Sequence, residues 1–308
     1  MRFVHESRAQ RVVFAPGSAP DAVAKEVADL GARRVMLIAS ERESVLADPI
    51  ATICPVVLRH DEVVMHVPVE VAERSRAAAS RSGADVVVSV GGGSTTGLAK
   101  AVALTTGLPI VAVPTTFAGS EATDVWGLTR GETKTTGVEV KVLPCSVVYD
   151  ATLLRSLPSE MAVASGLNAL AHCIDSMWGP RVDPIDQALA GEGIRALAAG
   201  LPRVAHGGAS LEGIEQTLYG AYLAAIAFAS AGSGMHHKIC HVLGGMFDLP
   251  HAQTHAVVLP HVLAFNVPHA PDAEQRIARG FASDGATEGL AHQELRPATT
   301  RRSDAGWA

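Results

Sequence analysis

The stretch "DVVVSVGGGSTTGLAK", residues 85–100, leads from a valine-rich run into three consecutive glycines and then into a helical pattern. Such a β-branched run is typical of a strand that is covered on both faces of a parallel sheet. Glycines at the turn let the backbone approach a ligand closely, and the N–H groups that open the next helix favour a phosphate. The stretch therefore predicts a phosphate-binding turn, although it matches neither G-x-G-x-x-G nor a P-loop. The alternative is a tight turn whose glycines serve packing alone.

The first half of the chain repeats this alternation of strand and helix. Apolar runs predict buried strands at 34–40, 85–90, 109–116 and 146–150, and helical spacing occurs between them at 21–31, 69–83 and 95–107. Strands that alternate with helices form a parallel sheet with helices on both faces. Residues 125–144 carry the alternation and the glycine turns of a β-hairpin inserted into this unit.

Beyond about residue 155, Ala- and Leu-rich segments with helical periodicity replace the strands. We therefore predict an α/β dinucleotide-binding domain over residues 1–155 and an all-helical catalytic domain over residues 156–281. From Ala282 on the apolar periodicity is lost, so residues 282–308 are expected to form an irregular tail, disordered, shortened or altered.

Composition excludes several classes of protein. The net charge of −6, with no run of Lys or Arg, argues against nucleic-acid binding. No apolar stretch reaches the roughly 18 residues of a membrane span, and the first residues lack the apolar region of a signal peptide. The four cysteines form no CxxC pair, which fits reduced thiols and a cytoplasmic location.

Two further segments favour a nucleotide at the carboxyl edge of the sheet. The loop at 114–123 offers small hydroxyl residues after one predicted strand, and the strand at 34–40 ends in Ala39-Ser40. Because neither of these is acidic, although Glu41 follows, we expect weak discrimination between NADH and NADPH. The predicted cofactor-binding residues are Ser40, Gly91, Gly92, Gly93, Ser94, Gly97, Thr115, Thr116 and Ser120.

Histidines are concentrated in the second half, with seven of the thirteen between His236 and His269. His237 and His241 lie four apart on one predicted helix face, and Asn168 and His172 do so on another. Imidazoles in such a cluster can hold a divalent metal or carry protons. A carboxylate would be the natural further metal ligand, but the chain has Asn168, so the pattern alone leaves both uses open. A single buried histidine would more often be a packing residue.

These segments together resemble the iron-containing alcohol dehydrogenase superfamily. The resemblance rests on the glycine turn with Gly97 and Lys100, the loop Pro114-Thr115-Thr116 with Gly119-Ser120-Glu121, the HxxxH pair, and "LPH" twice, ending at His251 and His261. It covers residues 1–281 and implies the dehydroquinate synthase-like fold, a nicotinamide cofactor (NADH or NADPH) and a cofactor role for Lys141. A solvated strand-edge lysine is the alternative for Lys141. The resemblance also places the superfamily's metal-ligand positions at Asn168, His172, His237 and His251.

Within the superfamily, "GLNALAHCID", "HHKICHVLGG" and "LPHAQTHAVVLPH" are most similar to the maleylacetate reductase branch. That branch carries Asn at position 168 and implies a site in which metal is not required. The implied reaction is NAD(P)H-dependent reduction of the C=C bond of maleylacetate, a dicarboxylate, to 3-oxoadipate in bacterial aromatic catabolism. The implied catalytic residues are His172 and His241, joined by His237 and His251. Substrate carboxylates are assigned to His237, His251 and His255, with Asn168.

Two rival functions remain at this point: a metal-dependent alcohol or polyol dehydrogenase, and a truncated chain that binds nucleotide without turnover. The superfamily also implies a homodimer, in which the strand-like residues 3–17 could pair across the interface. The expected partners are thus a small dicarboxylate and a second copy, with no nucleic acid and no membrane.

Overall fold

The computed structural model describes residues 1–131, 133–206, 210–247 and 249–293. Its first half is built on a six-stranded sheet with the order β1-β8-β5-β4-β2-β3, in which every neighbouring pair is parallel. The strands are β1 (Arg11–Phe14), β2 (Val35–Ile38), β3 (Val56–His60), β4 (Val86–Gly91), β5 (Ile110–Pro114) and β8 (Ser146–Tyr149). The four predicted strands are therefore confirmed as the centre of the sheet, together with its parallel arrangement.

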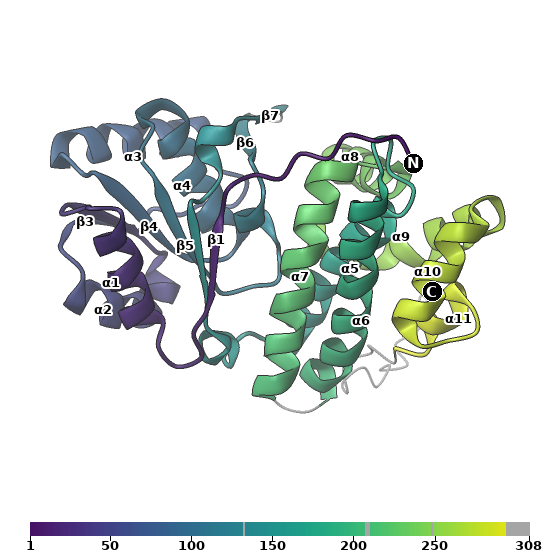
Figure 1. Cartoon of the computed structure of the whole chain (residues 1–308). Coiled ribbons are helices and arrows are strands. Elements are labelled where there is room, and N and C mark those ends of the chain that lie inside the picture. The colour runs from purple at the N-terminus through teal and green to yellow at the C-terminus, as the bar shows by residue number, and fades with distance from the viewer. Residues whose placement is uncertain (132, 207–209, 248, 294–308) are drawn as a thin grey trace, which may run out of the picture.

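Helices cover both faces of this sheet (Figure 1). On one face, Val86, Val88 and Val90 pack against α1 (Ala19–Asp29) and α2 (Ser44–Ile53). On the other, Val87 packs against α3 (Val69–Ser82) and α4 (Gly93–Thr106). Successive strand residues point to opposite faces, so a strand buried on both sides reads as the continuous apolar run seen in the sequence.

The segment α2 and β3 was not predicted. Pro49 lies inside α2 and interrupts the sequence pattern of a helix. β3 is an edge strand in which half-buried residues alternate with exposed ones, so it lacks a long apolar run. The predicted hairpin is confirmed: β6 (Val125–Arg130) pairs antiparallel with β7 (Thr133–Val138).

The second half is helical throughout its described residues. Its helices are α5 (Ser159–Ser176), α6 (Pro184–His206), α7 (Leu211–Ala231), α8 (Met235–Phe247), α9 (His251–Asn266), α10 (Pro271–Phe281) and α11 (Ala286–Ala291). The close packing of α6 on α7 needs glycine, because a Cβ on Gly200 would lie 2.7 Å from the carbonyl oxygen of Gly213. Short 3-10 turns connect several elements: Glu41–Glu43, Ser120–Ala122, Val140–Val142, Ala151–Leu154 and Val267–His269.

The prediction of an irregular tail from residue 282 is wrong for the part that the structure describes. Ala282 adopts a left-handed conformation and ends α10, after which α11 folds back onto it. A Cβ on Gly289 would lie 2.5 Å from Cβ of Phe281, so this contact depends on small residues. Small residues give little apolar periodicity, which is why the pattern missed the helix. Residues 294–308 lie outside the described residues.

No single described helix is long and apolar enough to cross a membrane. Only α7 and α8 taken together, which meet at a bend of 95°, reach that length and composition among the described segments.

Candidate active site

The glycine turn connects β4 directly to α4, as the sequence predicts. A Cβ on Gly91 would lie 2.3 Å from Oγ1 of Thr95, so only glycine permits this tight approach. The helix's own hydrogen bonds begin where the Thr96 N–H donates to the Gly92 carbonyl. The N–H groups of Gly93, Ser94 and Thr95 precede that bond and point out of the helix end, where an anion is favoured.

Glu43 lies against this turn and was not predicted as a site residue. Its Oε1 accepts hydrogen bonds from the Gly92 N–H (3.2 Å) and from Oγ1 of Thr115 (3.0 Å). Its Oε2 accepts from Oγ of Ser40 (2.8 Å) and from Oγ1 of Thr95 (3.3 Å). The three predicted cofactor residues Ser40, Gly92 and Thr115 are thus brought together on one carboxylate. Dinucleotide sites often have an acid at the end of such a strand, whereas this acid comes from the 3-10 turn that follows β2.

The second predicted loop lies beside the first. Thr116 borders the turn, since a Cβ on Gly92 would lie 3.0 Å from Cγ2 of Thr116. The buried Nζ of Lys100 fixes the loop by donating to the carbonyl oxygens of Ser120 (2.6 Å), Thr123 (2.8 Å) and Val125 (2.8 Å). Burial lowers the pKa of Lys100 to about 7. Lys100 therefore connects α4 to the loop that carries Thr116 and Ser120.

Two predicted cofactor residues lie at the edges of this region. Gly97 is half-buried on α4, with Cγ2 of Val67 3.0 Å from where its Cβ would be. Lys141 is exposed in the 3-10 turn Val140–Val142 and not in a strand. The cofactor roles of both residues stay predictions.

On the helical side, His237 is bound to a buried carboxylate. His237 Nδ1 lies 2.8 Å from Oδ2 of Asp175, which also accepts from the Gly234 N–H at 3.0 Å. Asp175 has no exposed surface. A carboxylate at Nδ1 fixes the proton there, so Nε2 of the neutral ring carries the lone pair. The sequence does not single out Asp175, because its contact with His237 joins α5 to α8 across 62 residues.

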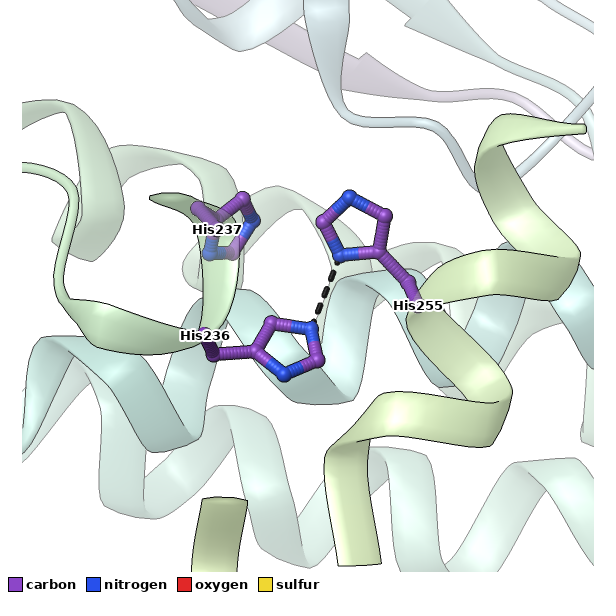
Figure 2. A group of neighbouring side chains, drawn as sticks. All are labelled: His236, His237 and His255. Carbon is purple, nitrogen blue, oxygen red and sulfur yellow. Dashed lines mark hydrogen bonds between the residues drawn. The ribbon is translucent and has the colours of Figure 1, made fainter. Parts of the chain in front are cut away.

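His236 and His255 form a second buried pair (Figure 2). His236 Nε2 lies 2.9 Å from Nδ1 of His255, and the ring of His255 also lies 4.6 Å from that of His237, centroid to centroid. Within the described residues, Nδ1 of His236, Nε2 of His237 and Nε2 of His255 are buried without a hydrogen-bond partner. Native proteins rarely leave such atoms unpaired, so they mark where a ligand could bind.

Asn168 and His172 share one face of α5, as their spacing predicts. The ring of His172 lies 4.7 Å from that of Phe228 and 4.8 Å from that of His237, centroid to centroid, and the rings of Phe228 and His237 themselves lie 4.1 Å apart. In the described part of the chain, Oδ1 of Asn168 and Nδ1 of His172 are also buried and unpaired. Burial, followed by neighbouring imidazoles, lowers the pKa of His172 and of His237 well below the usual value. Both rings are therefore neutral near pH 7.

His241 and His251 form the exposed rim of the cluster, with ring centroids 6.2 Å apart. Desolvation, followed by the ammonium group of Lys134, lowers the pKa of both, although each ring keeps an exposed edge. Lys134 belongs to β7, so the hairpin brings a cation to the rim that the sequence did not single out. All the histidines predicted for the site thus lie in one cluster, in which His237 and His255 are buried, His172 is half-buried, and His241 and His251 are exposed. The buried Asn168 lies one turn before His172 on α5.

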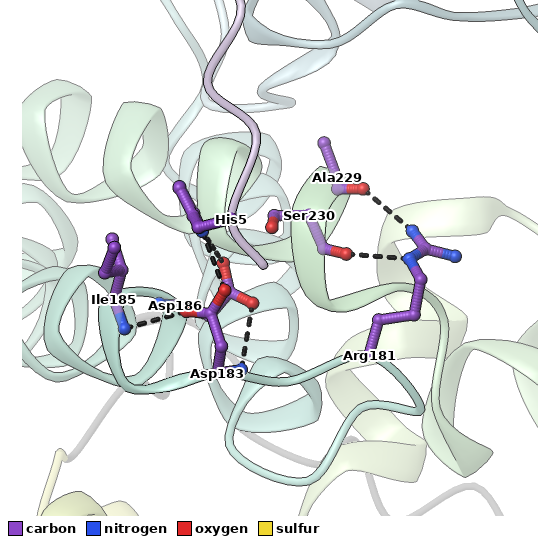
Figure 3. A network of polar contacts seen from close by, with 7 residues as sticks. All are labelled: His5, Arg181, Asp183, Ile185, Asp186, Ala229 and Ser230. Atoms are coloured by element: carbon purple, nitrogen blue, oxygen red, sulfur yellow. Dashed lines mark hydrogen bonds and ion pairs between the residues drawn. The ribbon is translucent and has the colours of Figure 1, made fainter. Parts of the chain in front are cut away.

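Ligand atoms converge more tightly in a different set from the predicted metal positions. Among the described residues, two groups of three have potential metal-ligand atoms all within 4.8 Å of one another: His236 with His237 and His255, and His5 with Asp183 and Asp186. The second group is explained as a helix cap (Figure 3). The side chain of Asp183 accepts from the Asp186 N–H (3.0 Å), and that of Asp186 accepts from the Asp183 N–H (3.2 Å), which is a reciprocal capping box. His5 lies 2.9 Å from Asp183 and fastens the N-terminal segment to α6.

Comparison with known proteins places this site in a family. Residues 9–151 match the model of iron-containing alcohol dehydrogenase, and residues 162–301 match that of the Fe-containing alcohol dehydrogenase family, C-terminal. The chain is 43% identical to a maleylacetate reductase of Burkholderia cepacia over 290 residues, which are 94% of this chain and 82% of that protein.

Two solved structures agree with this assignment. One is an iron-containing alcohol dehydrogenase from Corynebacterium glutamicum, with a TM-score of 0.94 and 60% identity, covering 96% of this chain and 83% of that one. The other is a maleylacetate reductase from Agrobacterium tumefaciens, with a TM-score of 0.89 and 39% identity, covering 95% of this chain and 84% of that one. The chain therefore belongs to the iron-containing alcohol dehydrogenase family.

Proposed function

We propose that the chain is an oxidoreductase that uses NADH or NADPH to reduce the C=C bond of maleylacetate, giving 3-oxoadipate. The observation that carries the proposal is the cluster of neutral imidazoles, together with the buried amide of Asn168 one helical turn before His172, where a charged metal ligand would be the natural choice. Relatives that bear the name maleylacetate reductase, at 43% and 46% identity, support the choice of substrate.

The residues at the glycine turn fit a dinucleotide. The N–H groups of Gly93, Ser94 and Thr95 suit its pyrophosphate, and Glu43 offers a carboxylate to a ribose hydroxyl. When bound, the reduced nicotinamide supplies the hydride that the reaction requires.

A metal ion at the superfamily's positions fits less well. Asn168 offers a neutral carbonyl in place of a carboxylate, so charge compensation of the ion would depend on the Asp175 carboxylate behind His237. His251 is exposed, and the ligand atoms that converge within 4.8 Å belong to another set. We therefore propose that the reaction does not require a metal.

The chain's own groups could then serve a substrate that carries two carboxylates and a conjugated ketone. Addition of hydride to the alkene carbon beta to the ketone shifts the C=C electrons and builds negative charge on the ketone oxygen as an enolate, and an N–H of neutral His172 can donate to that oxygen. His241, at the exposed rim, can deliver a proton to the carbon alpha to the ketone as the enolate collapses back to the ketone. The Lys134 ammonium, with His251 beside it, suits a substrate carboxylate, and Asn168, His237 and His255 line the buried side.

The test is NADH oxidation by the purified chain with maleylacetate, before and after treatment with a chelator. We expect turnover that survives chelation. Turnover of alcohols that is lost on chelation and restored by metal would instead support the metal-dependent alcohol dehydrogenase. Binding of NADH without any turnover would support the nucleotide-binding alternative.

Lys134 and Lys238 provide a matched pair of variants that tests the substrate assignment, with Lys238 as the control. Lys134→Gln should raise KM for the dicarboxylate with little change in kcat, whereas Lys238→Gln, exposed on α8, should change neither. Equal effects of the two variants would contradict a carboxylate site at Lys134.

We also propose a homodimer and a cytoplasmic location. β1 lies at the edge of the sheet and leaves one side open to another strand. Light scattering after size-exclusion chromatography tests the dimer, and a monomer mass would contradict it. The four cysteines are unpaired, as reduced thiols would be, and fractionation of producing cells tests the location.

A further inference from the structure

The buried wall of the cluster contains three imidazoles that each place one ring nitrogen close to the other two. His236 and His237 lie at the start of α8, and His255 lies one turn inside α9 (Figure 2). Their side chains are 0–2% exposed. Three ligand atoms, one from each ring, lie within 4.8 Å of one another. Within the described parts of the chain, Nε2 of His237 is buried and unpaired, whereas Nε2 of His236 and Nδ1 of His255 lie 2.9 Å apart in a hydrogen bond.

We propose that His236, His237 and His255 form a site for one divalent transition-metal ion of the Zn²⁺, Co²⁺ and Ni²⁺ class. Neutral imidazole is a preferred ligand of these ions. Zn–N bonds of about 2.0–2.1 Å place the nitrogens of a tetrahedral site roughly 3.4 Å apart. The group therefore needs only small side-chain rotations to close on an ion, which would replace the hydrogen bond between His236 and His255.

Asp175 supplies what a set of three imidazoles lacks. Metal-bound histidines usually donate their second ring N–H to a carboxylate, which fixes the tautomer and makes the ring a better ligand. His237 already has this arrangement, with Nδ1 at 2.8 Å from the buried carboxylate and Nε2 left unpaired. The same carboxylate places a negative charge beside the ion, which offsets part of the ion's charge in a buried site.

The site is distinct from the one that the superfamily resemblance implies. Both sets include His237, but the implied set adds Asn168, His172 and His251, whereas this set adds two histidines of the opposite wall, His236 and His255. In the other group with converging ligand atoms, the carboxylates of Asp183 and Asp186 already accept hydrogen bonds from backbone N–H groups in the helix cap. The imidazole set instead consists of neutral rings, one of which, His237, keeps an Nε2 that is unpaired among the described residues.

Titration of the chelator-treated full chain with Co²⁺ tests the proposal, because tetrahedral Co²⁺ with nitrogen ligands has a strong visible absorption. We expect one equivalent to bind. His236→Gln should weaken binding at least roughly tenfold, while His251→Gln, altered in the implied set only, should leave it unchanged. Absence of binding, or loss in His251→Gln with retention in His236→Gln, would overturn the proposal.

A second measurement avoids dependence on the folding of a variant. Zn²⁺ added to the unaltered protein should shift the imidazole ¹⁵N resonances of His236, His237 and His255. Shifts confined to His172, His237 and His251 would assign the ion to the other set and overturn the proposal. Neither experiment uses turnover, so failure of the proposed reductase activity does not affect the outcome.

Discussion

The glycine turn of the α/β half and the histidine cluster of the helical half both bring polar groups together. At the turn the polar side chains form hydrogen bonds with one another, whereas in the cluster several polar side-chain atoms have no hydrogen-bond partner within the described chain. Four donors of the turn region converge on the carboxylate of Glu43. In the cluster, by contrast, five nitrogen or oxygen atoms of described residues are buried and unpaired: Asn168 Oδ1, His172 Nδ1, His236 Nδ1, His237 Nε2 and His255 Nε2.

This difference separates a region whose polar side chains are paired without a ligand from one whose polar side chains are not. An unpaired buried polar atom costs about 1–3 kcal/mol, so the cluster is held in place by its surroundings at a cost in stability. A ligand that pairs with these atoms recovers that cost, and substitutions there should affect function most strongly. Substitutions at Glu43 should instead adjust which ligand binds.

The largest effect on activity is expected from substitutions of the histidines that are proposed to react with the substrate. His172→Ala and His241→Ala should each lower kcat/KM for maleylacetate roughly 10²–10⁴-fold, because each removes a proposed donor to the developing charge or the carbon. Steady-state kinetics measure this, with His261→Ala, on the exposed side of α9, as the control. Near-normal turnover in both variants would show that the roles are wrongly assigned.

Asp175→Asn should lower kcat roughly tenfold to a hundredfold, because the amide can no longer hold the proton on Nδ1 of His237. The ¹⁵N shifts of the His237 ring report the tautomer directly, and they separate this effect from a general loss of structure. If kcat falls while the tautomer stays unchanged, Asp175 serves packing and not the orientation of His237.

These two sites show what the sequence can and cannot predict. HxxxH spacing and the pair Asn168 and His172 are local, so the periodicity of a helix is enough to group them. The contact of Asp175 with His237 spans 62 residues, and that of His236 with His255 crosses between helices. Such contacts depend on how α5, α8 and α9 pack, which no local pattern records. The same holds for Glu43, whose partners come from three separate loops.

The buried imidazoles also make stability depend on pH. Burial lowers the pKa of His236 to about 4, so below the ordinary value near 6.5 the unfolded chain binds more protons than the folded one. The free energy of unfolding is therefore highest above this pH. The titration of His236 alone should lower it by about 2 kcal/mol between pH 7 and pH 5. Urea midpoints of the metal-free chain at the two pH values measure the loss. His236→Gln should reduce the slope, and an unchanged slope would show that another group titrates.

The smallest effect is expected at the turn, where Glu43 already has its partners. An acid that accepts from a ribose 2′-hydroxyl repels the 2′-phosphate of NADPH, so Glu43 predicts a preference for NADH that Ala39 and Ser40 do not. Glu43→Gln should shift the ratio of kcat/KM for the two cofactors by about tenfold towards NADPH, equal to about 1.4 kcal/mol. Glu41→Gln is the matched control, since Glu41 is exposed in the same 3-10 turn. If both variants change the ratio equally, the effect comes from the general charge of the turn. Glu43 would then have no role in choosing the cofactor, and its carboxylate would only cap the start of α4 when no ligand is bound.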